Sequence, residues 1–408
     1  MTSLVATEFQ DKDLSFVIEK ATPFVLRSPI ATPVQTSFGT MYDRPALYLL
    51  LEDSSGQTGI GEVWCNFPSC GAEHRAQLLE TAILPALIKK EFADPQQCFH
   101  TLQQQFQRLA IQAGEPGPIA QSICGIDIAL WDLVSKRHGL PLYKLFAGTP
   151  DIDVYASGIN PTDVAQTLSR CQNAGYKAFK LKIGFGDDID YPNIEHSCAS
   201  LGPGQKLMVD ANQAWTVEQA LQQVTRLADY PLQWLEEPVM ADTPAAHWST
   251  LAAAAKTPLA AGENISDQQA FLDANASDWL AVMQPDMCKW GGFSGVLPIA
   301  KNALDNGKRY CPHFLGGGVG LAASAHLLAA VGGDGALEID CNPNPLREAL
   351  FSPVIEDGKI SIGEQPGLGL DPDALSTLLA AGPYQQSKIH QSKIHQSKIH
   401  QSRINGPA

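Results

Sequence analysis

The sequence predicts an α/β protein in which an α+β domain at residues 14–148 precedes a (β/α)₈ barrel at residues 149–350. Two observations predict this fold. Strand-like runs are followed by helical patterns in the first part of the chain. Eight short apolar runs then alternate with helix-like stretches over roughly 200 residues, which is the length that a barrel of parallel strands needs. An open, doubly wound sheet is the alternative that this alternation leaves open.

The first domain is expected to begin with β structure and to end with helices. The runs FVLRSPI, PALYLLLED and GQTGIGEVW are apolar or alternating and are separated by turn signals such as DSSG, which indicates strands between residues 14 and 64. Farther along, apolar positions recur at helical spacing. We expect helices within residues 72–90, 95–112 and 119–139, and the last of these ends at a glycine.

The expected barrel strands are the short apolar runs that follow residue 149. Helical stretches such as TVEQALQQVTRLADY and SDQQAFLDANA separate them. The runs lie at residues 153–159, 178–184, 205–212, 232–238, 258–264, 279–286, 309–314 and 336–342.

Two further segments follow the barrel. Residues 351–384 return to β and turn character, and we expect this segment to pack back on the first domain. Residues 385–408 contain repeats of SKIHQ. A five-residue step on a helix rotates by about 500°, so His390, His395 and His400 would not share one face. We interpret this segment as a peripheral low-complexity tail rather than a metal site.

The composition argues against several classes of partner. A formal net charge of −15 is unfavourable for binding nucleic acid or an anionic membrane surface. No apolar run reaches the roughly 18 residues that span a bilayer, and the first residues lack the pattern of a secretory signal. The nine cysteines include no CxxC pair, as expected of reduced thiols. We therefore expect a cytoplasmic protein with a small-molecule substrate.

An ionisable residue stands at or near the end of each expected barrel strand from the second onward. Successive members are about one βα unit apart. Because the C-terminal ends of barrel strands form one rim, this spacing places all of them around one cavity. They are Lys182, Asp210, Glu236, Glu263, Asp286, His313 and Glu338.

Three consecutive strands of this set provide a hard, oxygen-rich ligand cluster, made of Asp210, Glu236 and Glu263. Such a cluster suits Mg²⁺, or Mn²⁺, better than Zn²⁺. Buried salt bridges to Lys180 and Lys182 are the structural alternative. The neighbouring Glu237 and Asn264 are expected to lie behind the proposed ligands or on the opposite face.

Two possible bases flank the carboxylates. Lys182 belongs to the second strand, and His313 belongs to the seventh, nearly across a closed barrel. Asp286 on the sixth strand could accept the imidazole N–H and raise its basicity. Lys180 shares a strand face with Lys182, so its charge is expected to bias one of the two ammonium groups toward the neutral form.

The ordered motifs KLKIG, VDANQAW, LEEP, GEN, QPDMCKWGG and CPH, followed by LE, resemble those of the enolase superfamily. More narrowly, they resemble the mandelate racemase branch of the mandelate racemase/muconate lactonizing enzyme family. The resemblance runs from about residue 14 to 375. SICGIDIALWDLVSKRHGLPLYKLFAG is similar to the family's linker between cap and barrel, and QPGLGL to its C-terminal return.

This resemblance implies a fold and a chemistry. The fold is a cap domain over a modified TIM barrel, (β/α)₇β, in a protein that forms a homo-oligomer. The chemistry is Mg²⁺-dependent abstraction of the proton α to a carboxylate through an enediolate, a pattern described in general for this superfamily. The ligands of the single metal ion would be Asp210, Glu236 and Glu263.

The resemblance also implies roles for the other strand-end residues. Lys182 would be the base on one face of the substrate, and the His313–Asp286 dyad would act on the other. Glu338 and Lys180 would contact the substrate carboxylate. Cycloisomerase and succinylbenzoate synthase relatives that use lysine bases carry a lysine where this chain has Asp286, which points toward racemases and acid-sugar dehydratases.

Substrate specificity is expected to come mainly from the first-domain loops QTSFGTMYDR and EVWCNFPSCG. Arg44 could pair with a second carboxylate of the substrate, although a surface arginine is the alternative. The glycine-rich GGGVG after His313 would open room for a substrate with several hydroxyl groups. The candidate substrate-binding residues are Tyr42, Arg44, Trp64, Asn66 and Asn212.

Several reactions remain open at this point. Dehydration of an acid sugar is favoured, with His313 expelling the β-hydroxyl group. Racemisation or epimerisation of a 2-hydroxy or amino acid and cycloisomerisation of an aldarolactone are the alternatives. A Schiff-base lyase that uses Lys180 or Lys182 and a non-catalytic sugar-acid binder are more distant alternatives.

Overall fold

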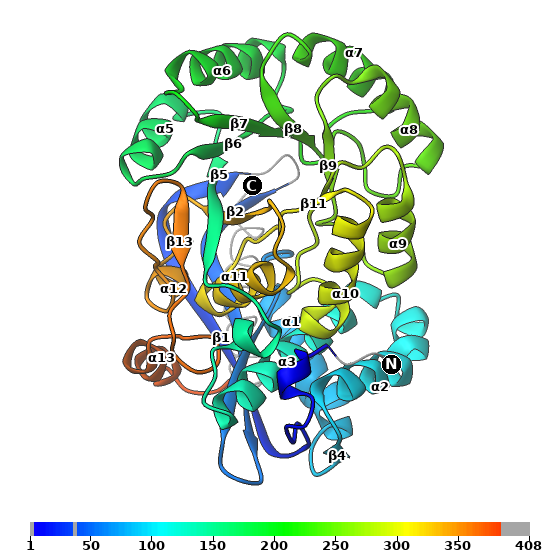
Figure 1. Ribbon diagram of the computed structural model, residues 1–408, viewed down its shortest axis with the longest axis vertical. Helices are drawn as coiled ribbons and strands as arrows, with labels where there is room; N and C mark the ends of the chain where they lie inside the picture. Colours follow the sequence, from blue (N-terminus) through cyan, green and yellow to red (C-terminus); the bar gives the residue numbers. More distant parts are fainter. Residues whose placement is uncertain (1–3, 36–38, 385–408) are drawn as a thin grey trace, which may run out of the picture.

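The computed structural model describes residues 4–35 and 39–384. It contains an antiparallel sheet covered by helices and a parallel barrel, which occupies the upper part of the view in Figure 1. The fold has an N-terminal cap and a modified TIM barrel, as predicted. The repetitive tail at residues 385–408, with its three histidines, lies outside the described residues.

The cap begins with a four-stranded sheet in the order β3-β2-β1-β4, whose strand pairs are all antiparallel. After the 3₁₀ turn Thr7–Phe9, its strands are β1 (Phe16–Gln35), β2 (Thr40–Asp53), β3 (Thr58–Val63) and β4 (Glu91–Phe92). The helices are α1 (Gly71–Leu78), which continues through a π turn (Leu79–Ile83) and a 3₁₀ turn (Leu84–Ala86), α2 (Pro95–Ala113), α3 (Pro116–Arg137) and α4 (Leu142–Leu145).

Helix α3 lies directly against strand β3. The close approach requires glycine on both elements, because a Cβ atom on Gly61 would lie 1.9 Å from the carbonyl oxygen of Gly125. Asp132 of α3 accepts a hydrogen bond from the backbone N–H of Ile60 at 2.9 Å. Strand β3 (Thr58–Val63) is therefore fixed on a buried helix, and its far end leads to Trp64 and Asn66.

The barrel sheet has the strand order β11-β10-β9-β8-β7-β6-β5-β12, with β13 added beside β5. The eight barrel strands, all within the predicted apolar runs or overlapping them, are β5 (Asp151–Ile159), β6 (Ala178–Lys182), β7 (Lys206–Asp210), β8 (Leu232–Glu236), β9 (Leu259–Ala261), β10 (Val282–Met283), β11 (Arg309–Tyr310) and β12 (Ala336–Asp340). Neighbouring barrel strands are parallel, and their alternate side chains fill the barrel interior.

A helix follows each of the first seven barrel strands. These helices are α5 (Val164–Asn173), α6 (Asp187–Ser200), α7 (Val217–Leu227), α8 (Ala245–Ala254), α9 (Gln268–Ala276), α10 (Gly292–Asp305) and α11 (Gly318–Val331). Strand β12 is followed only by the four-residue α12 (Pro345–Glu348). The architecture is therefore (β/α)₇β rather than the complete (β/α)₈ barrel that the strand count alone suggested.

The segment after α12 contacts both parts of the molecule. Its strand β13 (Lys359–Ser361) pairs antiparallel with barrel strand β5. Farther along, the N–H of Leu368 donates to Asp132 of α3 at 2.8 Å, and α13 (Pro372–Leu379) lies beside the first domain in Figure 1. The segment thus does more than pack back on the cap, because it also extends the barrel sheet.

Two general expectations can be compared with the structure. All nine cysteines are free thiols, and six of them are buried. Among the residues that the structure describes, no helix is both long and apolar enough to cross a membrane.

His326, on α11, is a buried neutral histidine where this barrel helix packs against α4. Its Nδ1 accepts a hydrogen bond from the backbone N–H of Tyr143 at 3.0 Å, so the ring proton sits on Nε2. Burial lowers the pKa of His326 to about 4, although the carbonyl of Leu368 opposes this shift. Protonation would break the hydrogen bond to Tyr143 and place a charge in an apolar environment.

We expect His326 to make the protein less stable in acid. As the pH falls through 6.5, the unfolded chain takes up the proton first, and the folded state takes it up only near 4. This histidine should therefore cost about 2 kcal/mol of unfolding free energy between pH 7 and pH 5. Denaturant titrations at several pH values measure the unfolding free energy as a function of pH. In His326→Gln, the decrease between pH 7 and pH 5 should be smaller by this amount. Equal slopes in both proteins would contradict it.

Candidate active site

The ionisable residues of the barrel gather at the carboxyl ends of its strands. Lys182, Asp210 and Glu236 are the last residues of β6, β7 and β8 and are neighbours in register. Glu263 follows β9 by two residues, while Asp286 and His313 follow β10 and β11 by three. Glu338 lies within β12 and pairs with Tyr155 of β5. The active sites of TIM barrels lie at this rim.

The two lysines of β6 bind the carboxylates in different ways. Lys180 is fully buried, and its Nζ lies 2.6 Å from Glu236 Oε1, 2.9 Å from Glu338 Oε1 and 3.6 Å from Asp210 Oδ2. Lys182 is partly exposed, and its Nζ lies 2.6 Å from Asp210 Oδ2. The salt bridges that were the structural alternative are therefore present in this structure, and they occupy two of the three proposed metal ligands.

These carboxylates overturn one electrostatic expectation. Burial lowers the pKa of Lys182, and the charge of Lys180 lowers it further, as predicted from their shared face. Asp210, Glu236 and Glu263 together raise the pKa of Lys182 by more, so the net shift is upward. The pKa of Lys180 is also well above its usual value, because Glu236 and Glu338 outweigh the effect of burial. Neither lysine is biased toward the neutral form here.

His313 lies within reach of two carboxylates. Its Nδ1 is 2.9 Å from Asp286 Oδ2, and its Nε2 is 3.4 Å from Glu263 Oε2. Burial lowers the pKa of His313, but Glu263, Glu338 and Asp286 raise it to about 9 in total. The imidazole is therefore held as a cation that can donate a proton.

The chemistry of the carboxylates fits a hard divalent cation, although their present geometry does not form a metal cluster. Asp210, Glu236 and Glu263 come from adjacent strands and are oxygen ligands of the kind that Mg²⁺ prefers. Among the described residues, no group of three or more His, Cys, Asp or Glu side chains is arranged to hold a metal ion. The reason is visible in the contacts, because each carboxylate is turned toward a lysine.

Glu236 is held by further donors that the sequence did not indicate. Gln284 Nε2 donates to its Oε2 at 2.6 Å, and the indole N–H of Trp234 donates to the same atom at 3.3 Å. Asn264, a residue that lines the cavity, donates through Nδ2 to both carboxylate oxygens of Glu237, at 3.0 and 2.9 Å. These contacts orient the buried carboxylates of Glu236 and Glu237, as supporting residues do around metal ligands.

A cavity of about 270 Å³ lies above the rim, between barrel and cap. The proposed bases Lys182 and His313 both line it, together with Glu263. Among the predicted substrate-binding residues, Trp64, Asn66 and Asn212 line it as well. The remaining lining residues are Phe67, Gln213, Asn264, Lys289 and Leu315.

Lys289 is a cavity residue that the sequence reasoning missed. Its Nζ donates to Asn264 Oδ1 at 2.7 Å, lies 3.2 Å from Glu263 Oε1 and stands 4.9 Å from the ring centre of Trp64. It follows Asp286 by three residues in the motif QPDMCKWGG. Its position on the loop beyond a barrel strand was the available signal, because such loops form the active-site rim.

Two predicted substrate contacts lie elsewhere. Tyr42 is 73% exposed on β2, near residues 36–38, which lie outside the described part of the chain. Arg44 is buried, and it forms an ion pair with Asp340 and donates to the carbonyl oxygen of Pro343 at 3.2 Å. Its guanidinium joins the cap to the end of β12. The structure therefore supports neither the expected contact of Arg44 with a substrate carboxylate nor the alternative of a surface arginine.

Arg44→Met is expected to affect stability rather than specificity. Removing one partner of a buried ion pair leaves an uncompensated charge and should cost about 3 kcal/mol of unfolding free energy. Arg347, 3.4 Å from the same carboxylate of Asp340, limits the loss. Denaturant unfolding measures it, with Arg27→Met as the control because its ion pairs are partly exposed. Equal losses in the two variants would contradict this assignment.

The glycine-rich stretch after His313 does not open the cavity. A Cβ atom on Gly317 would lie 2.3 Å from the hydroxyl oxygen of Tyr48, and one on Gly320 would lie 2.4 Å from the ring of Phe314. These glycines therefore allow protein groups to approach closely. The prediction that they make room for a substrate with several hydroxyl groups is wrong.

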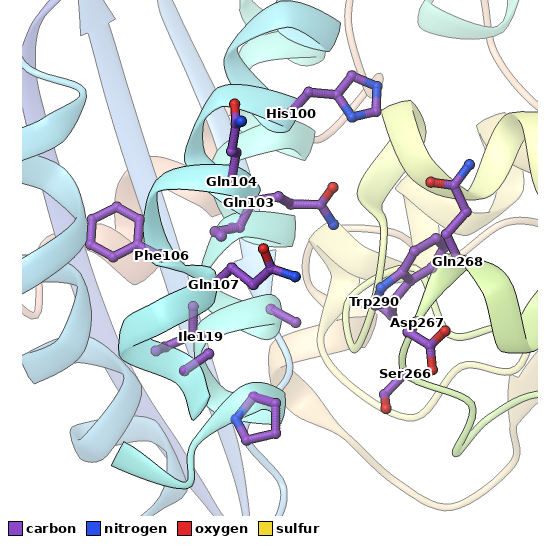
Figure 2. Close-up of a pocket in the computed structure, with 14 residues that line it drawn as sticks. His100, Gln103, Gln104, Phe106, Gln107, Ile119, Ser266, Asp267, Gln268 and Trp290 are labelled. Carbon is purple, nitrogen blue, oxygen red and sulfur yellow. The ribbon is translucent and has the colours of Figure 1, made fainter. Parts of the chain in front are cut away.

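A second hollow, of about 370 Å³, lies between helices α2 and α3 and the start of α9 (Figure 2). Gln103 and Gln107 point across it toward Gln268 and Trp290. Its lining among the described residues includes none of the ionisable strand-end groups. It is therefore separate from the candidate active site.

Comparison with protein families identifies both parts of the chain. Residues 20–147 match the family described as mandelate racemase/muconate lactonizing enzyme, N-terminal domain. Residues 163–376 match the family described as enolase C-terminal domain-like. Together these matches cover most of the chain, including all seven strand-end residues.

Two characterised relatives illustrate the reactions found among similar proteins. The chain is 30% identical over 366 residues to the 3,6-anhydro-alpha-L-galactonate cycloisomerase of Streptomyces coelicolor, covering 87% of this chain and 96% of that protein. It is 35% identical over 266 residues to the L-talarate/galactarate dehydratase of Salmonella typhimurium, covering 63% and 64% of the two chains.

Two solved structures share the fold over nearly the whole chain. A mandelate racemase/muconate lactonizing enzyme of Bordetella bronchiseptica RB50 is 50% identical, with a TM-score of 0.85, and the match covers 90% of this chain and 100% of that one. A racemase of Streptomyces coelicolor A3(2) with bound magnesium is 27% identical, with a TM-score of 0.79 and coverage of 89% and 99%.

Proposed function

The chain belongs to the mandelate racemase/muconate lactonizing enzyme family of the enolase superfamily, and on this premise we propose that it dehydrates an acid sugar. The proposed reaction begins with abstraction of the proton α to a carboxylate and continues through an enediolate to loss of the β-hydroxyl group. The observation that carries the proposal is that Lys182 and His313 line one cavity together with the carboxylate Glu263.

The residues of this chain would divide the work as follows. Asp210, Glu236 and Glu263 would hold one Mg²⁺, which supplies a positive charge that stabilises the developing negative charge on the substrate carboxylate. Lys182 would take the α-proton on one face. Glu338 and Lys180 would contact the substrate carboxylate. Their own ion pair joins Lys180 Nζ and Glu338 Oε1 at 2.9 Å.

His313 would act on the other face as a general acid. Its Nδ1 is paired with Asp286, so the Nε2 proton is the one available to the β-hydroxyl group as the C–O bond breaks. Trp64 and Asn66 of the cap would exclude water above the reacting carbons.

A second candidate is cycloisomerisation of an aldarolactone or anhydro sugar acid. It is favoured by the relative named as a 3,6-anhydro-alpha-L-galactonate cycloisomerase, which matches most of this chain. The same first step serves both reactions, and the leaving group is then a ring oxygen instead of water. Racemisation, in which the two bases deprotonate and reprotonate one carbon, is the remaining variant.

The test is a panel of aldonates, aldarates and their lactones in D₂O with Mg²⁺, followed by NMR. A 2-keto-3-deoxy product supports dehydration, whereas ring opening without loss of water indicates cycloisomerisation. Deuterium at the α-carbon with a new stereoisomer indicates epimerisation. Absence of both product formation and α-hydrogen exchange across the whole panel would refute the proposal.

Two rival classes give different results in simple assays. A Schiff-base lyase using Lys180 or Lys182 would be trapped by borohydride and would be insensitive to EDTA. A binding module without catalysis would bind sugar acids but leave their α-hydrogen unexchanged. The proposed dehydratase requires loss or exchange of the α-hydrogen, sensitivity to chelation and no borohydride adduct.

A further inference from the structure

A buried carboxylate of the cap lies against the loop that follows His313. Glu62, on β3, is 3% exposed. Its Oε1 accepts a hydrogen bond from the backbone N–H of Gly317 at 2.5 Å, and its Oε2 accepts one from Gly320 at 2.7 Å. Burial raises the pKa of Glu62 to about 7, although these two N–H donors lower it. Neither the sequence reasoning nor the proposed mechanism assigns this carboxylate a role.

Side chains also hold the rest of the loop. The N–H of Phe314 donates to Glu338 Oε2 at 3.2 Å. Asn66 of the cap donates to the carbonyl oxygen of Leu315 at 2.6 Å, and Asn344 donates to that of Gly316 at 2.8 Å. Each residue from 314 to 317 therefore has a backbone group bonded to a distant side chain, and two of these side chains come from the cap.

The glycines of this loop make the contact with Glu62 possible. A Cβ atom on Gly316 would lie 2.8 Å from Glu62 Oε1, and one on Gly317 would lie 3.0 Å from either carboxylate oxygen. A side chain at either position would push the carboxylate away from the backbone. The approach of Glu62 is thus one of the contacts that require glycine here, beside those of Tyr48 and Phe314.

Glu62 stands on a rigid support. Strand β3 is fixed against α3 by the contact between Gly61 and Gly125. The same helix provides Asp127, which accepts hydrogen bonds from Phe293 and Ser294 at the start of α10, at 2.7 and 3.0 Å. The cap therefore bonds through buried carboxylates to the starts of the two helices that follow the strands of Asp286 and His313.

We propose that Glu62 is a positioning residue for His313, through which the cap fixes the loop that carries the imidazole over the substrate. The part of this inference that concerns catalysis rests on the proposed function. Misplacement of a catalytic group by about 1 Å can cost about 10²-fold in rate, so loosening this loop should be visible in the step that uses His313.

The expected result is a change in the ratio of two rates in one reaction, elimination of the β-hydroxyl group and exchange of the α-hydrogen. For a substrate whose α-proton faces Lys182, exchange of that proton needs Lys182, and expulsion of the β-hydroxyl needs His313. Glu62→Gln keeps the volume but places an amide N–H₂ against a backbone donor. We expect elimination to fall by about 10- to 100-fold, while α-hydrogen exchange into unreacted substrate stays within about threefold.

The experiment compares four proteins at pH 8.5, where Glu62 is ionised. They are the wild type, Glu62→Gln, the shortened carboxylate Glu62→Asp, and Glu19→Gln as a control on an exposed strand position of the same sheet. Glu62→Asp keeps the charge, and its ratio of elimination to α-hydrogen exchange should lie between those of the wild type and Glu62→Gln. It also serves as the test variant if Glu62→Gln does not fold.

Hydrogen–deuterium exchange of the amides at residues 315–320 reports on the loop without any substrate. Faster amide exchange in Glu62→Gln, together with a selective loss of elimination, supports the proposal. Unchanged amide exchange overturns it. Equal loss of elimination and α-hydrogen exchange also overturns it, because that result indicates a general structural role.

Failure of the proposed function is distinguishable from failure of this inference. If the wild type neither converts any acid sugar nor exchanges its α-hydrogen, the proposed function is wrong. The NMR shift of the His313 Cε1–H then decides the inference, since it should move in Glu62→Gln and stay in place in Glu19→Gln. An unmoved resonance in Glu62→Gln would overturn the positioning role.

Discussion

Replacing Lys182 by methionine is expected to lower turnover of an acid sugar by about 10³-fold while the protein stays folded. The Lys182 side chain is only partly buried and lines the cavity opposite His313, so it is placed to take the α-proton. Methionine keeps the length and apolar stem of the side chain but cannot accept a proton. Asp210 retains Lys180, 3.6 Å away, as a partner after the change. Steady-state rates with an active substrate from the NMR panel measure the effect.

Lys177→Met is the matched control for this variant. Lys177 belongs to the same short stretch of sequence, but its side chain is half exposed and pairs with Asp357 away from the rim. It should keep full activity. Full activity in Lys182→Met, or a comparable loss in Lys177→Met, would contradict the assignment of the base.

The barrel strands could be predicted from the sequence because buried parallel strands leave a strong local pattern. A strand that is covered on both faces must be apolar along its length, and a polar residue near its end is then conspicuous. This is how Lys182, Asp210 and Glu236 were found, and each is the last residue of its strand. The spacing of one βα unit then placed them on one rim.

The contacts between cap and barrel could not be predicted in the same way. Arg44 meets Asp340 across 296 positions of sequence, and Asn66 meets Leu315 across 249. No local periodicity encodes such pairs, because they depend on how two separately folded layers are placed. The roles of Arg44, Glu62 and the glycine-rich loop are therefore visible only in three dimensions.

The lysine pKa values show a related limit. Two ammonium groups on one strand face repel each other, and that inference from the sequence holds as a contribution to the pKa of Lys182. Its net direction depends on the distance to Asp210, which the sequence does not contain. Asp210, at 2.6 Å, and the nearby Glu236 and Glu263 together outweigh both burial and the charge of Lys180.

Removal of divalent metal is expected to abolish turnover, and Asp210→Asn is expected to reproduce that loss. Three carboxylates from adjacent strands carry more negative charge than Lys180 and Lys182 neutralise, and hard oxygen ligands favour Mg²⁺. Loss of a catalytic metal removes several kcal/mol of charge stabilisation, or about 10³-fold in rate. EDTA treatment followed by addition of Mg²⁺ or Mn²⁺ should remove and then restore activity.

Binding of Mn²⁺, followed by electron paramagnetic resonance, separates metal binding from catalysis. We expect one ion per chain in the wild type. Loss of residues that merely support metal ligands already costs 10- to 100-fold in affinity, so Asp210→Asn should weaken binding by at least about 10²-fold. Asp229→Asn, an exposed carboxylate beyond α7, is the control. Full turnover in EDTA, or unchanged Mn²⁺ affinity in Asp210→Asn, would show that the carboxylates serve only the salt bridges to Lys180 and Lys182.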